Sequence, residues 1–429
     1  MRTQEDILAM IEDEDIQFIR LQFTDINGNL KNIAVTPGQL DRVIANHYSF
    51  SGNTLFDNAY DYPDELYLHP DLDSFVVLPW RPQQGKVAKL VCDVYTEDGK
   101  PFYLSPRRIL KTVLDRAKAQ GYTFLVDPEC EFFLFHTDEN GLPTTITHER
   151  AGYMDVGPSD FGENARREIV LMLEDMGFDI ESSHHEDAPA QHEVDFKEQS
   201  ALQMADSIQT FRFAVRSVAK RFGLYATFMP KPRSDCAGSG MHIGIILMKD
   251  GRNLFRSPDG SISDQAYWFT GGILQHAPAL VAVANPTVNS YRRLHSGYGA
   301  PDRVNWSRRG ERSFAKINHK REDTRVELRF PDGSSNPYLL LAACIAAGID
   351  GMERQLDPGS DCWGAEPTAY PAVPATLKDA ISALSQDAVI CSALGQEFTE
   401  IFTEVKQKEW DSYMLCVSDW ELDRYLTRI

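Results

Sequence analysis

Acidic and imidazole side chains crowd one short stretch of the chain, residues 181–196. Four other segments have similar chemistry: Glu129-Cys-Glu131, Gly238-Ser-Gly-Met-His242, Arg325-Val-Glu-Leu-Arg329 and the basic residues 308–316. A globular protein holds this many acids and bases in its interior only when they bind metal or one another. These segments therefore predict a polynuclear divalent-metal site that arginines face.

Strand periodicity predicts which of these side chains lie together. Glu129 and Glu131 are two residues apart, so in a strand both carboxylates leave the same face. The same period places Glu327 and Arg329 on one face of a strand, and it turns Val326 and Leu328 toward the core. An isolated pair of acids would be interpreted as a solvated face. Here the apolar run at 132–135 indicates a buried strand, in which unpaired carboxylates would be costly.

The types of side chain indicate which metal and which reaction to expect. Carboxylates with one imidazole suit Mg²⁺ or Mn²⁺, whereas zinc sites use more His or Cys. His242 follows a Gly-Ser-Gly turn that lets backbone approach a ligand, while His184, His185 and His192 are interpreted as core or supporting histidines. A metal cluster that faces arginines is the arrangement that phosphoryl transfer needs. The chain lacks a Walker A motif and a Rossmann-type glycine motif, so a nucleotide would bind in another way.

Composition excludes several classes of protein. The formal net charge of −20 argues against a general nucleic-acid binder, and it is compatible with a small cationic substrate or simply with a soluble surface. Seven scattered cysteines without a C-x-x-C pair indicate reduced thiols. The N-terminus is too polar for a signal peptide, and the longest apolar run, 338–349, is too short to span a bilayer. We expect a cytoplasmic protein without a membrane partner.

The elements that must position the site fall into two α+β units. Residues 16–23 and 31–35 are predicted to form a hairpin around the turn at 25–28, and 66–80 and 86–95 to add strands. A boundary near 97–101 divides the chain into domains 1–100 and 101–429. Ser105 is predicted to cap a helix over 107–120, and residues from 337 onward are predicted to be mainly helical.

Many ordered motifs closely resemble type I glutamine synthetases, over essentially the whole chain. They are Arg20–Asp25, Pro70-Asp71, Gly152–Asp155, Glu181–Glu186, Ala190–Glu193, Thr227–Pro232, Gly238–His242, Asn285–Leu294 and Asn336–Leu339. The resemblance implies an N-terminal β-grasp domain and a catalytic domain on a curved antiparallel sheet. It also implies a dodecamer of two hexameric rings with active sites between subunits. ATP and glutamate would be substrates, with Mg²⁺ or Mn²⁺ as cofactor.

The resemblance also implies a role for each matching residue. One metal would be held by Glu131, Glu186 and Glu193, and a second by Glu129, His242 and Glu327. Arg293 and Arg329 would grip glutamate, with Gly238 near it. Arg312 would face the transferred phosphoryl group, and Lys316 stands where the family usually has an arginine on the ATP phosphates. Glu181 matches a glutamate of the nucleotide site.

Two departures from the family pattern concern the nitrogen donor. Ser51 and Gly299 replace an aspartate and a glutamate that form the ammonium site of ammonia-using members. This pattern is similar to that of γ-glutamyl-amine ligases, which couple glutamate to a primary amine or polyamine. An ordinary glutamine synthetase remains an alternative if other acids supply the ammonium site; those nearby in sequence are Asp57, Asp61, Asp64 and Glu65. A catalytically silent binding protein is a more remote one. Ala237, Gly244 and Ile246 are lesser departures near the substrates.

Overall fold

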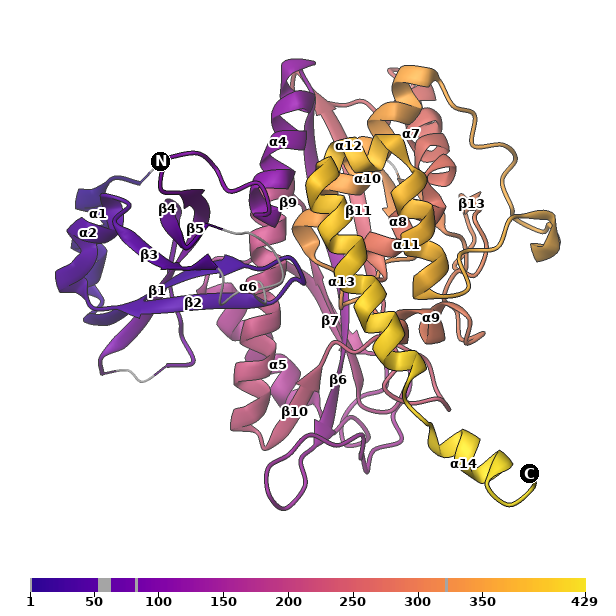
Figure 1. The fold of residues 1–429 in the computed structure, drawn as a ribbon, viewed down its shortest axis with the longest axis horizontal. Helices are drawn as coiled ribbons and strands as arrows, with labels where there is room; N and C mark the ends of the chain where they lie inside the picture. The colour runs from indigo at the N-terminus through magenta and orange to yellow at the C-terminus, as the bar shows by residue number, and fades with distance from the viewer. Residues whose placement is uncertain (1, 53–62, 82–83, 321–322) are drawn as a thin grey trace.

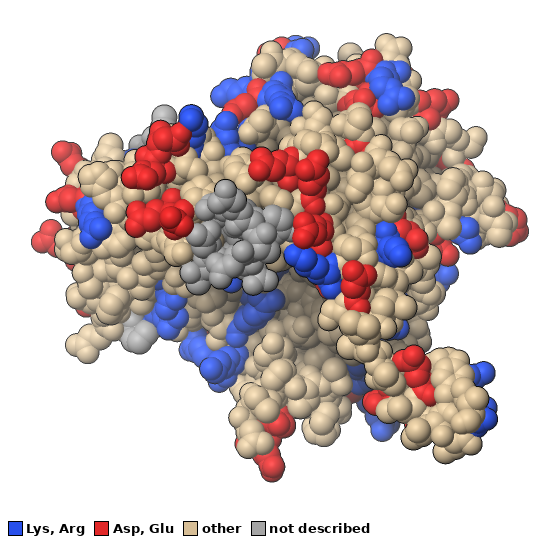
Figure 2. Space-filling model, viewed as in Figure 1, with Lys and Arg blue, Asp and Glu red and all other residues tan. Residues whose placement is uncertain are grey.

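The computed structural model describes residues 2–52, 63–81, 84–320 and 323–429 and contains two β-sheets (Figure 1). The smaller sheet lies at the left of Figure 1, the larger one in the middle, and helices of the C-terminal third cover the right side. The predicted α+β class is confirmed. On the face shown in Figure 2, acidic and basic side chains are interspersed over both units. Among the described residues, no helix is long and apolar enough to cross a membrane.

In the described part of the N-terminal unit, a five-stranded sheet is accompanied by two short helices and a 3-10 turn. Its elements are α1 (Gln4–Asp13), β1 (Ile16–Thr24), β2 (Leu30–Val35), the 3-10 turn η1 (Pro37–Gln39), α2 (Leu40–Ile44), β3 (Tyr48–Ser51), β4 (Glu65–Val77) and β5 (Lys86–Thr96). The strand order is β2-β1-β5-β4-β3. β1 pairs with β2 in antiparallel register, Ile19 opposite Val35, as the hairpin prediction requires. β3 was not predicted, because its four residues gave no clear alternation.

The second unit holds the larger sheet and most of the helices. Its strands are β6 (Thr123–His136), β7 (Ile180–His185), β8 (Gln191–Phe196), β9 (Gln199–Ser200), β10 (Leu224–Thr227), β11 (Met241–Lys249), β12 (Arg252–Asn253), β13 (Trp306–Ser307), β14 (Ala315–Lys320) and β15 (Asp323–Leu328). Its helices are α4 (Pro106–Ala119), α5 (Glu163–Asp175), α6 (Ala201–Arg221), α7 (Asp264–Gln275), α8 (Ala277–Ala284), α9 (Val288–Leu294), α10 (Pro337–Arg354), η2 (Pro367–Ala369), α11 (Leu377–Gln386), α12 (Ala388–Leu394), α13 (Gln396–Met414) and α14 (Asp419–Tyr425).

The main path of the larger sheet runs β13-β14-β15-β11-β6-β8-β7. The acid-rich stretch 181–196 forms the β7–β8 hairpin, with His184 opposite Glu193. β8 continues the pairing onto β6, and β6 pairs with β11. Segments that lie far apart in the sequence thus come together on the four central strands β15, β11, β6 and β8.

Apolar helices hold this sheet in place. α6 buries Phe211 against Phe196 of β8, with ring centroids 5.2 Å apart. α10, which contains the apolar run at 338–349, is buried almost all round, as a helix in the centre of a large core is. Ser105 is the N-cap residue of α4 and Pro106 its first residue, as predicted, and Ser105 has the extended backbone of a cap although its side chain makes no capping hydrogen bond.

Candidate active site

A cavity of about 760 Å³ lies along the four central strands. Its lining includes every side chain that the sequence predicted as a metal ligand: Glu129, Glu131, Glu186, Glu193, His242 and Glu327. Most of the basic and glycine residues predicted for substrates line it too: Gly238, Arg293, Arg312, Lys316 and Arg329. These residues come from segments far apart in the sequence, and the fold brings them to one place.

Strand register explains this convergence. His242 of β11 stands opposite Glu129 of β6, and Glu131 of β6 stands opposite Glu193 of β8. On the other side of β11, Gly244 stands opposite Glu327 of β15. Side chains that are opposite on adjacent strands lie about 4.5–5.5 Å apart at their Cβ atoms, so the sheet itself sets the spacing of these groups.

Glu129, His242 and Glu327 form one compact group. Each offers a ligand atom, and these atoms lie within 4.8 Å of one another. His242 Nδ1 is 2.7 Å from Glu129 Oε2. Burial raises the pKa of Glu129, but the bond to His242 and its charge outweigh burial and hold that pKa at about 2. Two carboxylates and one imidazole are a donor set that accommodates Mg²⁺ or Mn²⁺.

The other three predicted ligands line the same cavity but are held by protein groups. Glu131 accepts hydrogen bonds from the backbone N–H of Gly240 (2.9 Å) and from Gln191 Nε2 (2.7 Å). Glu186 is 3.2 Å from His184 Nε2. Burial, and then the nearby carboxylates, raise the pKa of Glu193 well above its usual range. A cation placed among these acids would relieve the repulsion, so the residues fit a second divalent ion.

His185 and His192 belong to the core, as predicted. Both side chains are fully buried. His185 Nε2 lies 2.8 Å from Glu149 Oε1, and its Nδ1 lies 2.7 Å from the carbonyl oxygen of Glu186. Two acceptors require His185 to donate from both nitrogens, which fixes the β7–β8 hairpin and leaves no lone pair for a metal.

Basic side chains cover another wall of the cavity. Arg329 pairs with Glu327, and its Nε donates to the carbonyl oxygen of Glu311 at 2.8 Å. Lys316 Nζ lies 2.7 Å from Glu311 Oε1. Arg293 is buried, and its guanidinium donates to backbone carbonyls of 329–331. Arg312 is exposed on the cavity wall. The arrangement can hold anionic groups close to the carboxylate cluster.

Comparison with known proteins decides the family. Residues 15–97 match the family described as glutamine synthetase, beta-grasp domain, and residues 103–425 match glutamine synthetase, catalytic domain. The chain belongs to the glutamine synthetase family. Glutamine synthetase of Clostridium saccharobutylicum is 45% identical over 438 residues, covering 99% of both chains. Glutamine synthetase of Staphylococcus aureus (strain N315) is 44% identical over 437 residues, covering 99% of this chain and 98% of that one.

Solved structures agree with this membership. The structure "GmaS/ADP complex-Conformation 1" is 33% identical, with a TM-score of 0.89 over 98% of this chain and 99% of that chain. "Apo GmaS without ligand" gives a TM-score of 0.88 at the same identity and coverage. The predicted β-grasp and catalytic domains are confirmed. Members of the glutamine synthetase family are ATP-dependent ligases that take small-molecule substrates and use divalent metals.

Three other predicted site residues, Gly299, Glu181 and Ser51, do not all line the cavity. Gly299 lines the cavity. Glu181 is exposed on β7, outside the described lining of the cavity. Ser51 is on β3, opposite Glu65 of β4, and also outside that lining. Of the other acids considered for the ammonium site, Asp64 and Glu65 are described, while Asp57 and Asp61 lie outside the described residues.

Several polar residues at this site were not predicted. Gln191 and Asp195 share the face of β8 that carries Glu193, so strand periodicity could have found them. Asp127 likewise shares a face with Glu129 and pairs with Arg325. Burial, though opposed by Arg325, raises the pKa of Asp127 to about 7. Glu311 lies in a connecting loop, where no periodicity could indicate it.

Proposed function

We propose that the protein joins the γ-carboxylate of L-glutamate to an amine larger than ammonia, with γ-glutamyl phosphate as intermediate. ATP phosphorylates the γ-carboxylate and leaves as ADP. The amine nitrogen then bonds to the carbonyl carbon of the acyl phosphate, the bond from that carbon to the phosphate oxygen breaks, phosphate departs, and the nitrogen loses a proton. The amine is a primary amine or a polyamine. The convergence of six metal-ligand candidates and four basic residues on one cavity, without an acid at 51 or 299, supports this reaction most strongly.

The metal ligands proposed here follow the predicted grouping. Glu129, His242 and Glu327 hold one divalent ion, Mg²⁺ or Mn²⁺. Glu131, Glu186 and Glu193 hold the other. Bound divalent ions neutralise charge on the phosphates and polarise the phosphoryl group. The carboxylates hold such ions at fixed positions, because they stand on rigid strands, and they supply the negative charge that the ions require.

The basic residues bind and orient the anionic substrates. We assign Arg293 and Arg329 to glutamate, next to Gly238, because both guanidinium groups reach the carboxylate cluster. Arg312 faces the phosphoryl group in transfer, and Lys316 binds phosphates of ATP. Glu311 holds Lys316 and Arg329 until anions replace it. Glu181 is assigned to the nucleotide only by its motif, since its side chain lies outside the described cavity lining.

The choice of amine follows from positions 51 and 299. Acids at these positions would hold an ammonium ion and take its proton, whereas serine and glycine leave space and no charge. Gly299 has open space beside its Cα, because a Cβ added there would meet nothing within 4 Å. An organic group on the nitrogen can therefore be accommodated next to the flap, residues 296–301.

We also propose domain boundaries and an oligomeric state for this chain. We divide the chain into an N-terminal domain, 1–100, and a catalytic domain, 101–429. Among the residues described, Ser51 does not line its own chain's cavity, and we therefore assign it to the active site of an adjacent subunit. That assignment implies a homo-oligomer with sites between subunits, proposed as a dodecamer of two hexameric rings in the cytoplasm.

A second candidate is an ordinary, ammonia-using glutamine synthetase. The names of the relatives at 44–45% identity favour it. It requires that other acids replace those missing at 51 and 299. The two candidates share every step except the choice of nucleophile.

The test is ADP release with glutamate, ATP, Mn²⁺ and a panel of amines. The panel holds ammonia, methylamine, ethylamine, putrescine and spermidine. At least one organic amine should give a kcat/KM above that of ammonia. Ammonia exceeding every organic amine would establish the ordinary synthetase instead. Binding of Mn²⁺ and ATP without ADP release from any amine would leave only a catalytically silent binding protein.

A further inference from the structure

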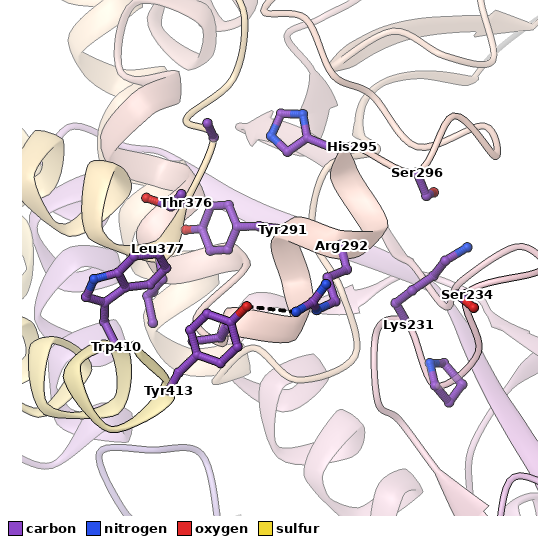
Figure 3. A pocket seen from close by; sticks show the side chains of 13 residues that line it. Lys231, Ser234, Tyr291, Arg292, His295, Ser296, Thr376, Leu377, Trp410 and Tyr413 are labelled. Carbon is purple, nitrogen blue, oxygen red and sulfur yellow. Dashed lines mark hydrogen bonds between the residues drawn. The ribbon is translucent and has the colours of Figure 1, made fainter. Parts of the chain in front are cut away.

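A second cavity, of about 780 Å³, shares α9 with the candidate active site (Figure 3). Arg293 of α9 lines the active-site cavity, while Tyr291 and Arg292 of the same helix line the second one. None of the predicted metal ligands borders this second cavity. Its volume is in the range of sites that bind small molecules. The proposed reaction gives this cavity no role.

The charged side chains among the described lining residues of the second cavity are all basic. They are Lys231 and Arg292, and no Asp or Glu is among these lining residues, although the whole chain has a formal net charge of −20. Three acids act electrostatically on Tyr291, namely Asp332, Asp379 and Glu409, and each accepts a hydrogen bond from a protein group. Asp379 accepts from the hydroxyl of Thr376, and Glu409 accepts from the backbone N–H of Val288. An anion therefore meets complementary charge in this cavity.

The opposite wall is aromatic. The rings of Tyr291, Trp410 and Tyr413 gather at the left of Figure 3, across from Lys231 and Ser234. Tyr413 Oη accepts a hydrogen bond from Arg292 at 2.9 Å, and this bond holds the guanidinium at the edge of the cavity. Such a wall favours a flat apolar group, because stacking on aromatic rings adds to the burial of apolar surface.

Tyr291 supplies an independent sign of a missing ligand. Its side chain is 5% exposed, and its hydroxyl has no hydrogen-bond partner among the residues that the structure describes. Leaving a buried hydroxyl without a partner is unfavourable, because the group loses its hydrogen bonds to water and gains none in return. Burial raises the pKa of Tyr291 well above its usual range, so the hydroxyl stays protonated and can donate to an incoming oxygen.

We propose that this cavity is a second binding site for small organic carboxylates that carry a flat apolar group. The carboxylate lies between Arg292 and Lys231, and the apolar group packs on Trp410 and Tyr291. The hydroxyl of Tyr291 donates to the ligand. This inference concerns a site apart from the proposed reaction, and it does not depend on which amine the protein uses.

The flap connects this site to the active-site cavity. Lys231 Nζ lies 4.1 Å from the centroid of the Tyr298 ring, and Tyr298 lines the active-site cavity. Ser296 lines the second cavity, and its hydroxyl donates to the carbonyl oxygen of Arg293 at 2.8 Å. A carboxylate that draws Lys231 toward itself competes for that cation with the Tyr298 ring and with the carbonyl oxygen of Cys236, to which Lys231 Nζ donates. Occupation of the second site should therefore be felt by residues 296–301.

The experiment is calorimetric titration of the full chain with 1-naphthoate, in the presence of chelator and without nucleotide. 1-Naphthamide, which has the same shape but no charge, is the matched ligand. We expect one naphthoate site per chain and about tenfold weaker binding of the amide. Arg292→Gln should weaken naphthoate about tenfold and Tyr291→Phe about threefold. Arg252→Gln, an exposed arginine of β12, should change nothing.

Three results would overturn the proposal. They are equal affinity for the acid and the amide, no naphthoate binding to the full chain, and loss of binding in Arg329→Gln with retention in Arg292→Gln. Tyr291→Phe keeps the ring and the packing, so it tests the hydroxyl even if Arg292→Gln folds poorly. Hydrogen exchange of residues 295–300 should slow on binding. Unchanged exchange at full occupancy would disprove the connection to the flap. No outcome of these titrations depends on catalytic activity.

Discussion

His242 Nδ1 and Glu129 Oε2 lie 2.7 Å apart, although 113 positions separate the two residues in the chain. The antiparallel pairing of β11 with β6 places them opposite each other. The third member of their group, Glu327, enters from β15 on the other side of β11. A hydrogen-bonded sheet holds these groups more rigidly than loops would, which favours binding of a metal ion with fixed geometry.

Glu327→Gln should greatly weaken binding of Mn²⁺. The substitution removes a charged ligand from the group formed with Glu129 and His242 while keeping the shape of the side chain. Loss of a residue that only hydrogen-bonds to a metal ligand lowers metal affinity roughly 10–100-fold. Loss of a direct ligand should therefore lower it about 100-fold or more. Titration of Mn²⁺ followed by electron paramagnetic resonance measures this without any turnover.

Glu311→Gln is the matched control for that measurement. Glu311 also contacts Arg329, with its Oε2 3.3 Å from Arg329 Nη2, but it is outside the compact ligand group. Its substitution should leave the affinity for Mn²⁺ unchanged. If both Glu311→Gln and Glu327→Gln lost affinity for Mn²⁺ equally, the total negative charge of the cavity would account for binding. Direct ligation by Glu327 would then be contradicted.

Gly240→Ala should strongly reduce activity while leaving the fold intact. An added Cβ would lie 2.5 Å from Arg293 Nη2 and 2.9 Å from Glu131 Oε1, so both functional groups must move. We expect kcat/KM for glutamate to fall about 100-fold or more, because small displacements of reacting groups have effects of this size. Gly38→Ala, where nothing lies within 4 Å of the added Cβ, should be neutral. Full activity in Gly240→Ala would contradict the assigned positions of Arg293 and Glu131.

The sequence was sufficient to predict the α+β fold and those acids, His242 and basic side chains of the cavity that lie in recognisable motifs. The spacing of Glu129 and Glu131, and of Glu327 and Arg329, indicated shared faces, and these side chains line one cavity. Hairpin register could be predicted only where a short turn joins the strands, as in β1–β2. Which distant strands pair depends on packing of the whole chain, so the order β15-β11-β6-β8 had no local signal.

Positions outside regular elements were hardest to predict. Glu311 holds Lys316 and Arg329, but its loop has no period from which its direction could be inferred. Ser105 has the residue type and backbone of a helix cap, yet its hydroxyl does not cap α4. A capping preference is small, about 1 kcal/mol, and tertiary contacts can override it.

Ser51→Asp combined with Gly299→Glu should raise the use of ammonia. The two acids would restore a binding site for the ammonium ion and a base for its proton, which is worth about 10²-fold or more in kcat/KM where the geometry is right. Gly299 has φ +91°, which L-residues rarely adopt, so strain in the flap should reduce the gain to roughly tenfold. Ser51→Asp with Gly299→Ala carries the same strain without the second acid and should gain less. Equal gains from both double variants would contradict a role for the carboxylate at 299.

His276→Gln should destabilise the protein in a pH-dependent way. His276 lies 2.6 Å from Asp387 and 3.0 Å from Asp350, linking α10 to the start of α12. Burial lowers the pKa of His276, but hydrogen bonds to the two aspartates outweigh burial and raise it above its ordinary value of about 6.5. A group whose pKa is raised on folding stabilises the fold fully at pH values below its ordinary pKa. This stabilisation is lost as the pH rises through the pKa of the folded state.

The loss in His276→Gln should be about 2–4 kcal/mol in the free energy of unfolding near pH 6, and it should shrink steadily in alkaline solution. Urea denaturation at several pH values measures it. His47→Gln, at an exposed position, should have no effect at any pH. A loss for His276→Gln that stays constant with pH would mean that the charged imidazole contributes nothing.

Competition between nucleophiles tests the central claim most directly. One reaction contains the protein, glutamate, ATP, Mn²⁺, and equal concentrations of ammonia and the best organic amine of the panel. Mass spectrometry then counts both products against ADP released. We predict that the γ-glutamyl amide of the organic amine accounts for most of the ADP. Glutamine as the major product would contradict the proposal that Ser51 and Gly299 turn this site away from ammonia.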